Sequence, residues 1–396
     1  MKSIPANCPE WLSQKILKKG GQISFYEFMK ISLNDLNDGY YGSGKSEIGL
    51  EGDFVTSPSL SNDFAYLLAG QIEDWIKQIR IETSSKEKVE ILEFGAGNGE
   101  LLKAILEWFL VNNKDLINYI RFKIVEINPG MIEKQKKLLS QFLDGFIDIS
   151  WISMDDLASN CVCGIVIAHE VLDAFPVERI QYSNKELFQQ IVSINHDKSI
   201  SLERIPLPKV IERKIDNLTL DLGINIPPMD APENWTSEIH MDNTDWLGSI
   251  YGSFKNVILL VIDYSLDAKR FYSSTRKEGT LLAYKDQVAS GDPLFMPGEC
   301  DLTSHVCNEV LINDAKKVGF ESVGMVKQGE ALLRLGLAER LHEIQNEFKY
   351  DLSQALIKRE ALLRLVDPIC LGDFKWFVFQ KFQKMNFDLQ TKFLID

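Results

Sequence analysis

Short apolar runs alternate with longer amphipathic segments through the middle of the chain. The runs are rich in β-branched and aliphatic residues and have the length of buried strands. We predict strands at 89–94, 122–127, 146–152, 164–168, 257–263 and 374–379, and helices at 100–111 and 129–143. The run from Val257 to Asp263 is the most apolar, which indicates a central strand covered on both faces. This alternation predicts an α/β fold with a doubly wound, Rossmann-like parallel sheet and right-handed crossovers.

The chain before this sheet predicts a helical cap. Apolar residues at helical spacing predict an amphipathic helix over residues 11–36, with Ser24 as an N-cap three residues before Glu27. The next predicted segments are two glycine-containing loops and a helix, at 38–44, 52–58 and 60–79.

A long segment separates the fourth and fifth predicted strands, about 85 residues, too many for a loop in a compact domain. Residues 178–204 have the pattern of antiparallel strands, and we interpret the proline-rich stretch 205–255 as a partly helical insertion. Residues 301–305 are predicted to begin a helix with Thr303 or Ser304 as its N-cap. The predicted organisation is an N-terminal cap or lid, an α/β core, an inserted subdomain, and the rest of the core with a C-terminal helical segment, at 1–85, 86–180, 181–255 and 256–396.

Composition and charge argue against a broad positive surface, although they leave a local basic patch open. Of 396 residues, 45% are hydrophobic and 25% are charged, the balance of a globular protein with a sizeable core. Lys and Arg total 43 against 57 Asp and Glu, so the net charge is −14. Non-specific binding to nucleic acid or to an anionic membrane needs a positive field, so the charge argues against both partners.

The six cysteines indicate neither a disulfide framework nor a metal site. Cys161 and Cys163 have the wrong spacing for zinc, and no second pair follows, so we interpret them as small buried hydrophobes and predict no metal. The first residues lack the apolar segment of a signal peptide, and no apolar run approaches the ~20 residues of a membrane helix. We therefore expect a soluble, cytoplasmic protein without membrane insertion.

A glycine loop follows the first predicted strand, where ligands of open parallel sheets bind. Its sequence is Glu93-Phe94-Gly95-Ala96-Gly97-Asn98-Gly99; a turn without a ligand is the structural alternative. The G-x-G-x-G spacing differs from the G-x-G-x-x-G of dinucleotide sites, and the Glu93 carboxylate would repel a pyrophosphate but attract an ammonium or sulfonium. Both features favour S-adenosylmethionine over a nicotinamide dinucleotide. The loop residues expected to bind it are Glu93, Gly95, Ala96, Gly97 and Gly99.

Further candidates for the cofactor site follow the second and third predicted strands. Glu126, next to Ile127, ends a strand where it can accept hydrogen bonds from both ribose hydroxyls; a solvated strand end is the alternative. After the following strand, Met154 is placed to pack on an adenine ring and Asp155 to accept from its amino group. An N-cap role for Asp155 or Asp156 fits the sequence equally well.

The fourth predicted strand ends in a pair of carboxylates. Glu170 and Asp173 are three residues apart, so in a helical turn both side chains point the same way. They are either solvent-exposed caps or a binding site for a cation such as a guanidinium, which pairs bidentately with carboxylate. We take them as candidate catalytic residues, with His169 beside them as a cofactor-binding candidate.

These blocks together resemble the MidA-type S-adenosylmethionine-dependent methyltransferases, a family that includes the mitochondrial complex I assembly factor that methylates arginine. The similar segments run in order from about residue 20 to 380. They comprise Tyr26 with Phe28 and Met29, Asp38–Tyr41, Gly52–Pro58, Glu93–Gly99, Val125–Glu126, His169–Val177, Ile262–Tyr264, Gly279–Leu281 and Asp301–Val306.

The resemblance implies a class I methyltransferase sheet, S-adenosylmethionine as cofactor, and an arginine on a partner protein, such as a respiratory-complex subunit, as methyl acceptor. It also implies lid or substrate roles for the side chains of Tyr40, Tyr41, Phe54, Thr56, Ser57 and His305. Two aromatics that plug the cap onto the core are the alternative for Tyr40 and Tyr41, and a neutral, hydrogen-bonded histidine is the alternative for His305.

Three other functions stay open on the sequence alone: a methyltransferase acting on another nucleophile or a small molecule, a non-catalytic assembly or scaffold protein, and a nicotinamide-dependent oxidoreductase. The intact Glu93 and loop glycines disfavour the scaffold, and the glycine spacing disfavours the oxidoreductase.

Overall fold

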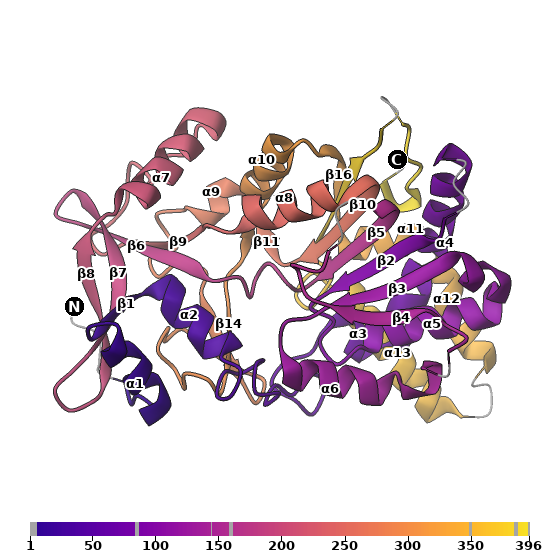
Figure 1. Ribbon diagram of the computed structural model, residues 1–396, viewed down its shortest axis with the longest axis horizontal. Helices are drawn as coiled ribbons and strands as arrows, with labels where there is room; N and C mark the ends of the chain where they lie inside the picture. The colour runs from indigo at the N-terminus through magenta and orange to yellow at the C-terminus, as the bar shows by residue number, and fades with distance from the viewer. Residues whose placement is uncertain are drawn as a thin grey trace.

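Seven strands form the main sheet, in the order β16-β17-β10-β5-β2-β3-β4 (Figure 1). The structure is a computed structural model that describes residues 6–83, 87–143, 145–157, 161–347, 351–383 and 387–394. The strands are β2 (Val89–Phe94), β3 (Ile120–Val125), β4 (Ile149–Ile152), β5 (Cys161–His169), β10 (Phe254–Asp263), β16 (Glu321–Lys327) and β17 (Lys375–Lys381). Strands β4, β3, β2, β5 and β10 are parallel, and β17 runs antiparallel between β10 and β16. This topology confirms the predicted doubly wound α/β fold.

Helices cover both faces of the main sheet and bury its apolar strands. One face packs against α4 (Asn62–Thr83), α5 (Glu100–Asn112), α11 (Gln328–Arg334), α12 (Leu337–Glu347) and α13 (Leu352–Val366). The other face packs against α8 (Asn243–Ser253) and α10 (Asn308–Val318). Every residue from Val257 to Asp263 in β10 is fully buried, as the apolar run predicts. Within the described ranges, no helix combines the length and the apolar character needed to cross a membrane.

A second, antiparallel sheet lies at the opposite end of the molecule (Figure 1). It consists of β1 (Gln22–Ser24), β6 (Val177–Ser183), β7 (Glu186–Ile194), β8 (Ile200–Pro206) and β9 (Thr236–His240), with α1 (Glu10–Lys18), α2 (Phe25–Asn34) and α7 (Lys209–Leu222) nearby. This sheet combines strands from the predicted cap, core and insertion. In contrast, α8, which belongs to the predicted insertion, packs on the main sheet.

The remaining elements are short. The strands are β11 (Ser265–Leu266), β12 (Leu282–Lys285), β13 (Val288–Ser290), β14 (Asp301–Thr303) and β15 (Val306–Cys307). The helices and 3-10 turns are α3 (Ser57–Leu60), α6 (Pro129–Leu138), α9 (Ala268–Phe271), η1 (Lys114–Tyr119), η2 (Ser140–Phe142) and η3 (Lys392–Leu394). Of these, β12, β13 and β14 form a small antiparallel sheet beside the functional site.

The prediction of one helix over residues 11–36 is wrong. Gly20 and Gly21 have φ angles of +92° and +86°, which glycine adopts without strain and which end α1. The chain then pairs as β1 with β7 before α2 begins. The predicted N-cap of this second helix is confirmed, because the Ser24 hydroxyl accepts a hydrogen bond from the Glu27 backbone N–H at 3.1 Å.

The helix predicted at 301–305 is also wrong. Residues 301–303 form β14, which pairs with β12, and α10 begins only at Asn308. Neither Thr303 nor Ser304 is an N-cap; the Ser304 backbone N–H donates to the carbonyl of Asp173. Pairing with a strand some 20 residues earlier in the chain overrides the local capping signal.

The cysteine prediction is confirmed where the structure describes it. The Cys163 side chain is buried in the core between the main sheet and its helices. The side chain of Cys161 lies outside the described part of the structure.

Candidate functional site

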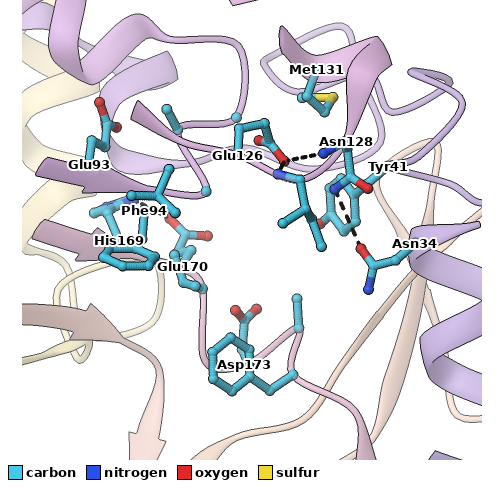
Figure 2. A pocket seen from close by; sticks show the side chains of 18 of the residues that line it. Asn34, Tyr41, Glu93, Phe94, Glu126, Asn128, Met131, His169, Glu170 and Asp173 are labelled. Atoms are coloured by element: carbon cyan, nitrogen blue, oxygen red, sulfur yellow. Dashed lines mark hydrogen bonds and ion pairs between the residues drawn. The ribbon is translucent and has the colours of Figure 1, made fainter. Parts of the chain in front are cut away.

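A cavity of about 470 Å³ opens at the carboxyl ends of β2, β3 and β5. Its wall includes the ends of these strands and the residues that follow them: 93–98 for β2, 125–128 for β3, and 169–171 with 173–176 for β5. Figure 2 shows the carboxyl groups of Glu126, Glu170 and Asp173 around this space, and Glu93 at the end of β2 also lines it. The volume is in the range of sites for small molecules, and the position is where parallel sheets bind ligands.

The glycine loop bends so that its backbone forms part of the cavity wall. Gly95, Gly97 and Gly99 all have positive φ angles, +54°, +52° and +91°. A Cβ on Gly97 would lie 3.0 Å from Cδ1 of Ile48, so a side chain here would narrow the space between the glycine loop and the N-terminal segment that carries Ile48. Gly95, Ala96 and Gly97 line the cavity, whereas Gly99 is the N-cap position of α5 and lies behind the wall.

Glu93 contributes a buried carboxyl group to the cavity. Its side chain is 4% exposed, and Oε2 has no hydrogen-bond partner among the described residues. Burial raises the pKa of Glu93 to about 8 because desolvation disfavours the charged form. A cationic ligand beside this carboxyl would favour its ionised form.

Glu126 lies at the end of β3, and the surrounding chain holds its carboxylate in one orientation. Oε1 accepts hydrogen bonds from the backbone N–H groups of Ile127 and Asn128, at 2.9 and 3.0 Å (Figure 2). Oε2 accepts from the Gln135 amide of α6 at 3.2 Å. Burial raises the pKa of Glu126, although these hydrogen bonds oppose the increase. The carboxylate is thus buried and fixed, not a solvated strand end.

The residues after β4 are only partly in the cavity. Met154 lines it, but Asp155 is exposed and does not. The local turn is instead stabilised by Asp156, whose carboxylate accepts from the Ser153 hydroxyl at 2.6 Å. Asp155 therefore does not face the cavity in this structure, and its contact with adenine stays a prediction.

Glu170 and Asp173 point into the same cavity (Figure 2). Glu170 has a φ of +52°, an unusual value for a non-glycine residue, and its backbone N–H donates to the carbonyl of Ile262 at 2.8 Å. Oε1 of Glu170 and Oδ1 of Asp173 are buried without a hydrogen-bond partner among the described residues. The other Asp173 oxygen accepts from the hydroxyl of Tyr264 at 2.5 Å.

The local electrostatics oppose full ionisation of this pair. Burial raises the pKa of Glu170 well above its ordinary value, and the negative charge of Asp173 raises it further. Burial also raises the pKa of Asp173 to about 6, although the Tyr264 hydroxyl opposes the increase. Two adjacent buried carboxyls with free oxygens need a cation to become fully charged.

His169 lines the cavity beside this pair and is neutral. Its ring packs edge-to-face on Phe64, with centroids 5.3 Å apart, and burial lowers its pKa to about 3. His169 therefore adds an uncharged, polar side chain between the glycine loop and Glu170.

The N-terminal segment supplies the remaining wall, but its predicted residues divide into two groups. Tyr41, Phe54 and Thr56 line the cavity. Tyr40 is fully buried outside it and donates to Asp53 at 2.7 Å. Ser57 is also outside the wall; it begins α3, and its backbone N–H donates to the Glu170 carboxyl.

His305 is not part of the cavity wall. Its ring packs edge-to-face on Tyr264, with centroids 5.5 Å apart, and its backbone carbonyl hydrogen-bonds Nε2 of His240 at 3.0 Å. Burial lowers the pKa of His305 to about 4. This environment is that of a neutral, packed histidine.

Three residues outside the predicted set of site residues shape the acidic end of the cavity: Asp301, Tyr264 and Asp263. For Asp263 and Tyr264, the sequence predicted only a supporting position at the end of the fifth strand. Asp301, at the start of β14, lines the cavity. The Asp263 carboxylate accepts from the backbone N–H groups of Leu172 and Asp173, at 3.0 and 3.2 Å, and so holds the turn that carries the carboxylate pair. The block from Asp301 to Val306 was visible as a motif, but its predicted helical conformation hid the side-chain role.

Comparison with known proteins gives consistent results for sequence and structure. The sequence profile of a family described as "Putative S-adenosyl-L-methionine-dependent methyltransferase" matches residues 67–326. The mitochondrial protein arginine methyltransferase NDUFAF7 of Homo sapiens is 26% identical over 397 residues, covering 93% of this chain and 82% of the relative. The homologue of Caenorhabditis elegans is 24% identical and covers 83% of this chain and 76% of its own length. A Burkholderia thailandensis protein solved with S-adenosyl-homocysteine superposes with a TM-score of 0.81 and 26% identity, covering 96% of this chain and 95% of that one.

The free protein should lose stability as the pH rises from 6.5 to 8. Unfolded carboxyls are ionised throughout this interval, whereas folded Glu93 and Asp301, both with pKa values of about 8, still hold protons at its lower end. The folded state therefore binds more protons than the unfolded state, and the free energy of unfolding falls as the pH rises. Burial lowers the pKa values of His169, His240 and His305, so these residues oppose the trend, and their effect declines above pH 6.5 as the unfolded imidazoles lose their protons.

Thermal unfolding across this interval tests the prediction with Glu93→Gln, which should show a shallower decrease in Tm than the wild type. The matched control is Glu212→Gln on the exposed face of α7, which should retain the wild-type slope. Equal slopes in all three proteins would contradict the raised pKa of Glu93.

A side chain at position 97 should block cofactor binding. Gly97→Ala introduces a Cβ at 3.0 Å from Ile48 and a strained φ of +52°, and we expect at least a tenfold increase in the Kd for S-adenosylmethionine by calorimetry. Gly223→Ala is the matched control, because Gly223 has a φ of +66° at the end of α7 with no atom near its Cβ position. Both variants carry the backbone strain, of about 1–2 kcal/mol. Equal cofactor affinity in the two would show that the loop does not approach the ligand.

Proposed function

This chain belongs to the family of S-adenosyl-L-methionine-dependent methyltransferases matched above, and we propose that it methylates an arginine side chain of a partner protein. The observation that carries the proposal is the buried pair Glu170 and Asp173, each with an unpartnered oxygen in the wall of the cavity. The relatives from Homo sapiens and Caenorhabditis elegans are protein arginine methyltransferases, which supports the same acceptor.

The residues of the glycine-loop end fit S-adenosylmethionine. The unpartnered Oε2 of Glu93 is suited to the ammonium of its methionine part, and the fixed carboxylate of Glu126 to its ribose hydroxyls. The absent Cβ of Gly97 leaves room for close contact with the loop backbone. When bound, S-adenosylmethionine supplies a methyl group on a positively charged sulfur; transfer to a nitrogen leaves S-adenosylhomocysteine and frees one proton from that nitrogen.

The carboxylate pair fits a guanidinium group. A guanidinium has a pKa above 12, so it arrives charged and is a poor nucleophile until it is oriented and polarised. Glu170 and Asp173 would bind its N–H groups, and the free Oε1 of Glu170 would be available to take the released proton. An acceptor cation would also relieve the repulsion between the two buried carboxyls. The pair would thus contribute orientation, charge and proton acceptance.

The N-terminal segment would exclude water from this site. Tyr41, Phe54 and Thr56 form the wall opposite the strand ends. The segment is anchored on the cofactor side by the Asn98 amide, which donates to the carbonyl of Ile48 at 3.3 Å. Low water content strengthens the electrostatic contacts of the acceptor with the carboxylates.

The acceptor is proposed to be a protein, with a respiratory-complex-type subunit as the example that the relatives suggest. Affinity capture with the full chain, followed by mass spectrometry of methylated arginines in wild-type and deletion cells, tests this directly. Arginine methylation that depends on the protein would support the proposal. Methylation of lysine or of a small molecule in place of arginine would replace it with the alternative acceptor class.

Removing the charge of the carboxylate pair should separate catalysis from cofactor binding. Glu170→Gln and Asp173→Asn keep the side-chain size but not the charge that attracts a guanidinium. We expect the Kd for S-adenosylmethionine to stay within a few-fold and methyl transfer to fall by a factor of about 100, near 2.7 kcal/mol of transition-state stabilisation. Calorimetric binding and radiolabelled methyl transfer to an extract of deletion cells give the two readouts.

The exposed Glu212→Gln variant serves as the control and should match the wild type in both assays. Normal methyl transfer by both amide variants would place the acceptor site elsewhere. Joint loss of cofactor affinity and thermal stability would assign the pair a structural role.

A further inference from the structure

Asp301 brings a third buried carboxyl group to the acceptor end of the cavity. It begins β14, its side chain is 3% exposed, and it lines the same cavity as Glu170 and Asp173. Oδ1 of Asp301 has no hydrogen-bond partner among the described residues, and the carboxyl also accepts from the hydroxyl of Tyr41. It is therefore held from one side and free on the other, as Asp173 is by Tyr264.

The three carboxyls are close enough to affect one another. Burial raises the pKa values of Asp301 and Glu170, the charge of Asp173 raises both further, and the charge of Asp301 adds to the increase for Glu170. Among the described residues that line the cavity, Lys30 is the only lysine or arginine, and it lies on the exposed surface of α2. The site therefore holds several acids without a cation of its own to neutralise them.

We propose that Asp301 directly contacts the methyl acceptor and that the three carboxylates together select a guanidinium over an ammonium. This inference rests on the proposed function and specifies its acceptor site. A guanidinium is planar and presents five N–H donors along three edges, whereas an ammonium is a compact, strongly hydrated charge. Three carboxyls from two chain segments, two in the turn after β5 and one at the start of β14, can each receive a different edge of the planar cation.

Apart from the hydrogen bonds that its carboxyl accepts from the Tyr41 hydroxyl and the Leu302 backbone N–H, the described part of the structure shows no further role for the Asp301 side chain. The pairing of β14 with β12 uses the backbone at position 301, which any residue would supply, and no ion pair within the described residues involves its carboxyl. Burying an acid with a free oxygen is unfavourable for folding, so asparagine at this position should be tolerated or stabilising. The carboxyl is better explained by a charged ligand than by stability.

Competition between two small cations tests the selectivity. The full-length protein, saturated with S-adenosylhomocysteine, is titrated with methylguanidinium chloride and, separately, with methylammonium chloride at constant ionic strength. We expect the wild type to bind methylguanidinium at least about tenfold more tightly, and Asp301→Asn to reduce that preference to within about threefold. Affinity for S-adenosylhomocysteine should change less than threefold in the variant.

Kinetics and two further variants separate contact from a merely structural role. Asp301→Asn should raise the KM for the protein acceptor more than it lowers kcat, and Asp301→Glu should recover part of the preference. Tyr41→Phe removes the hydrogen bond that orients the Asp301 carboxyl and should weaken the preference for methylguanidinium by a smaller factor. This variant replaces Asp301→Asn in the test if Asp301→Asn does not fold. Asp216→Asn on the exposed face of α7 is the matched control and should behave as the wild type.

The outcomes distinguish this inference from the proposed function. Preference for methylguanidinium that survives unchanged in Asp301→Asn, or in Tyr41→Phe where that variant replaces it, overturns the role of Asp301 and leaves arginine methylation in place. A wild type that binds S-adenosylhomocysteine but prefers methylammonium, or neither cation, overturns both. Loss of preference in Asp301→Asn with normal stability and cofactor affinity supports the three-carboxylate site.

Discussion

The carboxylate of Asp263 fixes the turn on which the acceptor end of the site depends. It is fully buried at the end of β10 and accepts three backbone hydrogen bonds, from the N–H groups of Leu172, Asp173 and Tyr264. The turn after β5 leaves the sheet with Glu170 in a left-handed conformation, which costs roughly 1 kcal/mol or more unless surrounding contacts impose it. Asp263 joins the carboxyl ends of β5 and β10, and its hydrogen bonds to Leu172 and Asp173 hold the turn that contains Glu170.

The same arrangement brings several buried acidic groups together, and their burial does not stabilise the folded state. Burial raises the pKa values of Glu93, Asp173 and Asp301 to about 8, 6 and 8, and those of Glu170 and Asp263 rise well above the ordinary range. A protein interior normally pairs such groups or leaves them out. Their presence is consistent with two cationic ligands, one at each end of the cavity, since a ligand can provide the missing charge when it binds.

Much of the fold was predictable because its signals are local. Apolar runs at strand length, glycines after a strand and acids at strand ends are contained within a few neighbouring residues, and topology alone brings those ends to one edge. Asp301 could not be found in this way, because its β-strand is defined by pairing with residues 282–284 and its carboxyl is oriented by Tyr41, both distant in the sequence. The wrong prediction of one helix over residues 11–36 has a different cause. Gly20 and Gly21 are a local signal for a helix end, but apolar residues recur at helical spacing on both sides of them and mask that signal.

The two ends of the cavity come from different parts of the molecule. The residues proposed to hold the cofactor, including Glu93 and Glu126, all belong to the main sheet and its loops. The acceptor end also needs Tyr41 from the N-terminal segment and Asp301 from the small sheet of β12, β13 and β14.

Asp53 connects these two outer parts. Its carboxylate accepts from the hydroxyl of Tyr40, pairs with Lys285 at 3.0 Å, and accepts from the backbone N–H of Asp286 in the turn between β12 and β13. Tyr41, next to Tyr40, and Asp301, across from Tyr284 on β12, are therefore positioned by one buried carboxylate. The proposed acceptor end therefore depends on the docking of the N-terminal segment through Tyr41 and on the small sheet through Asp301, whereas at the glycine loop the same segment contributes Ile48 to the cavity wall.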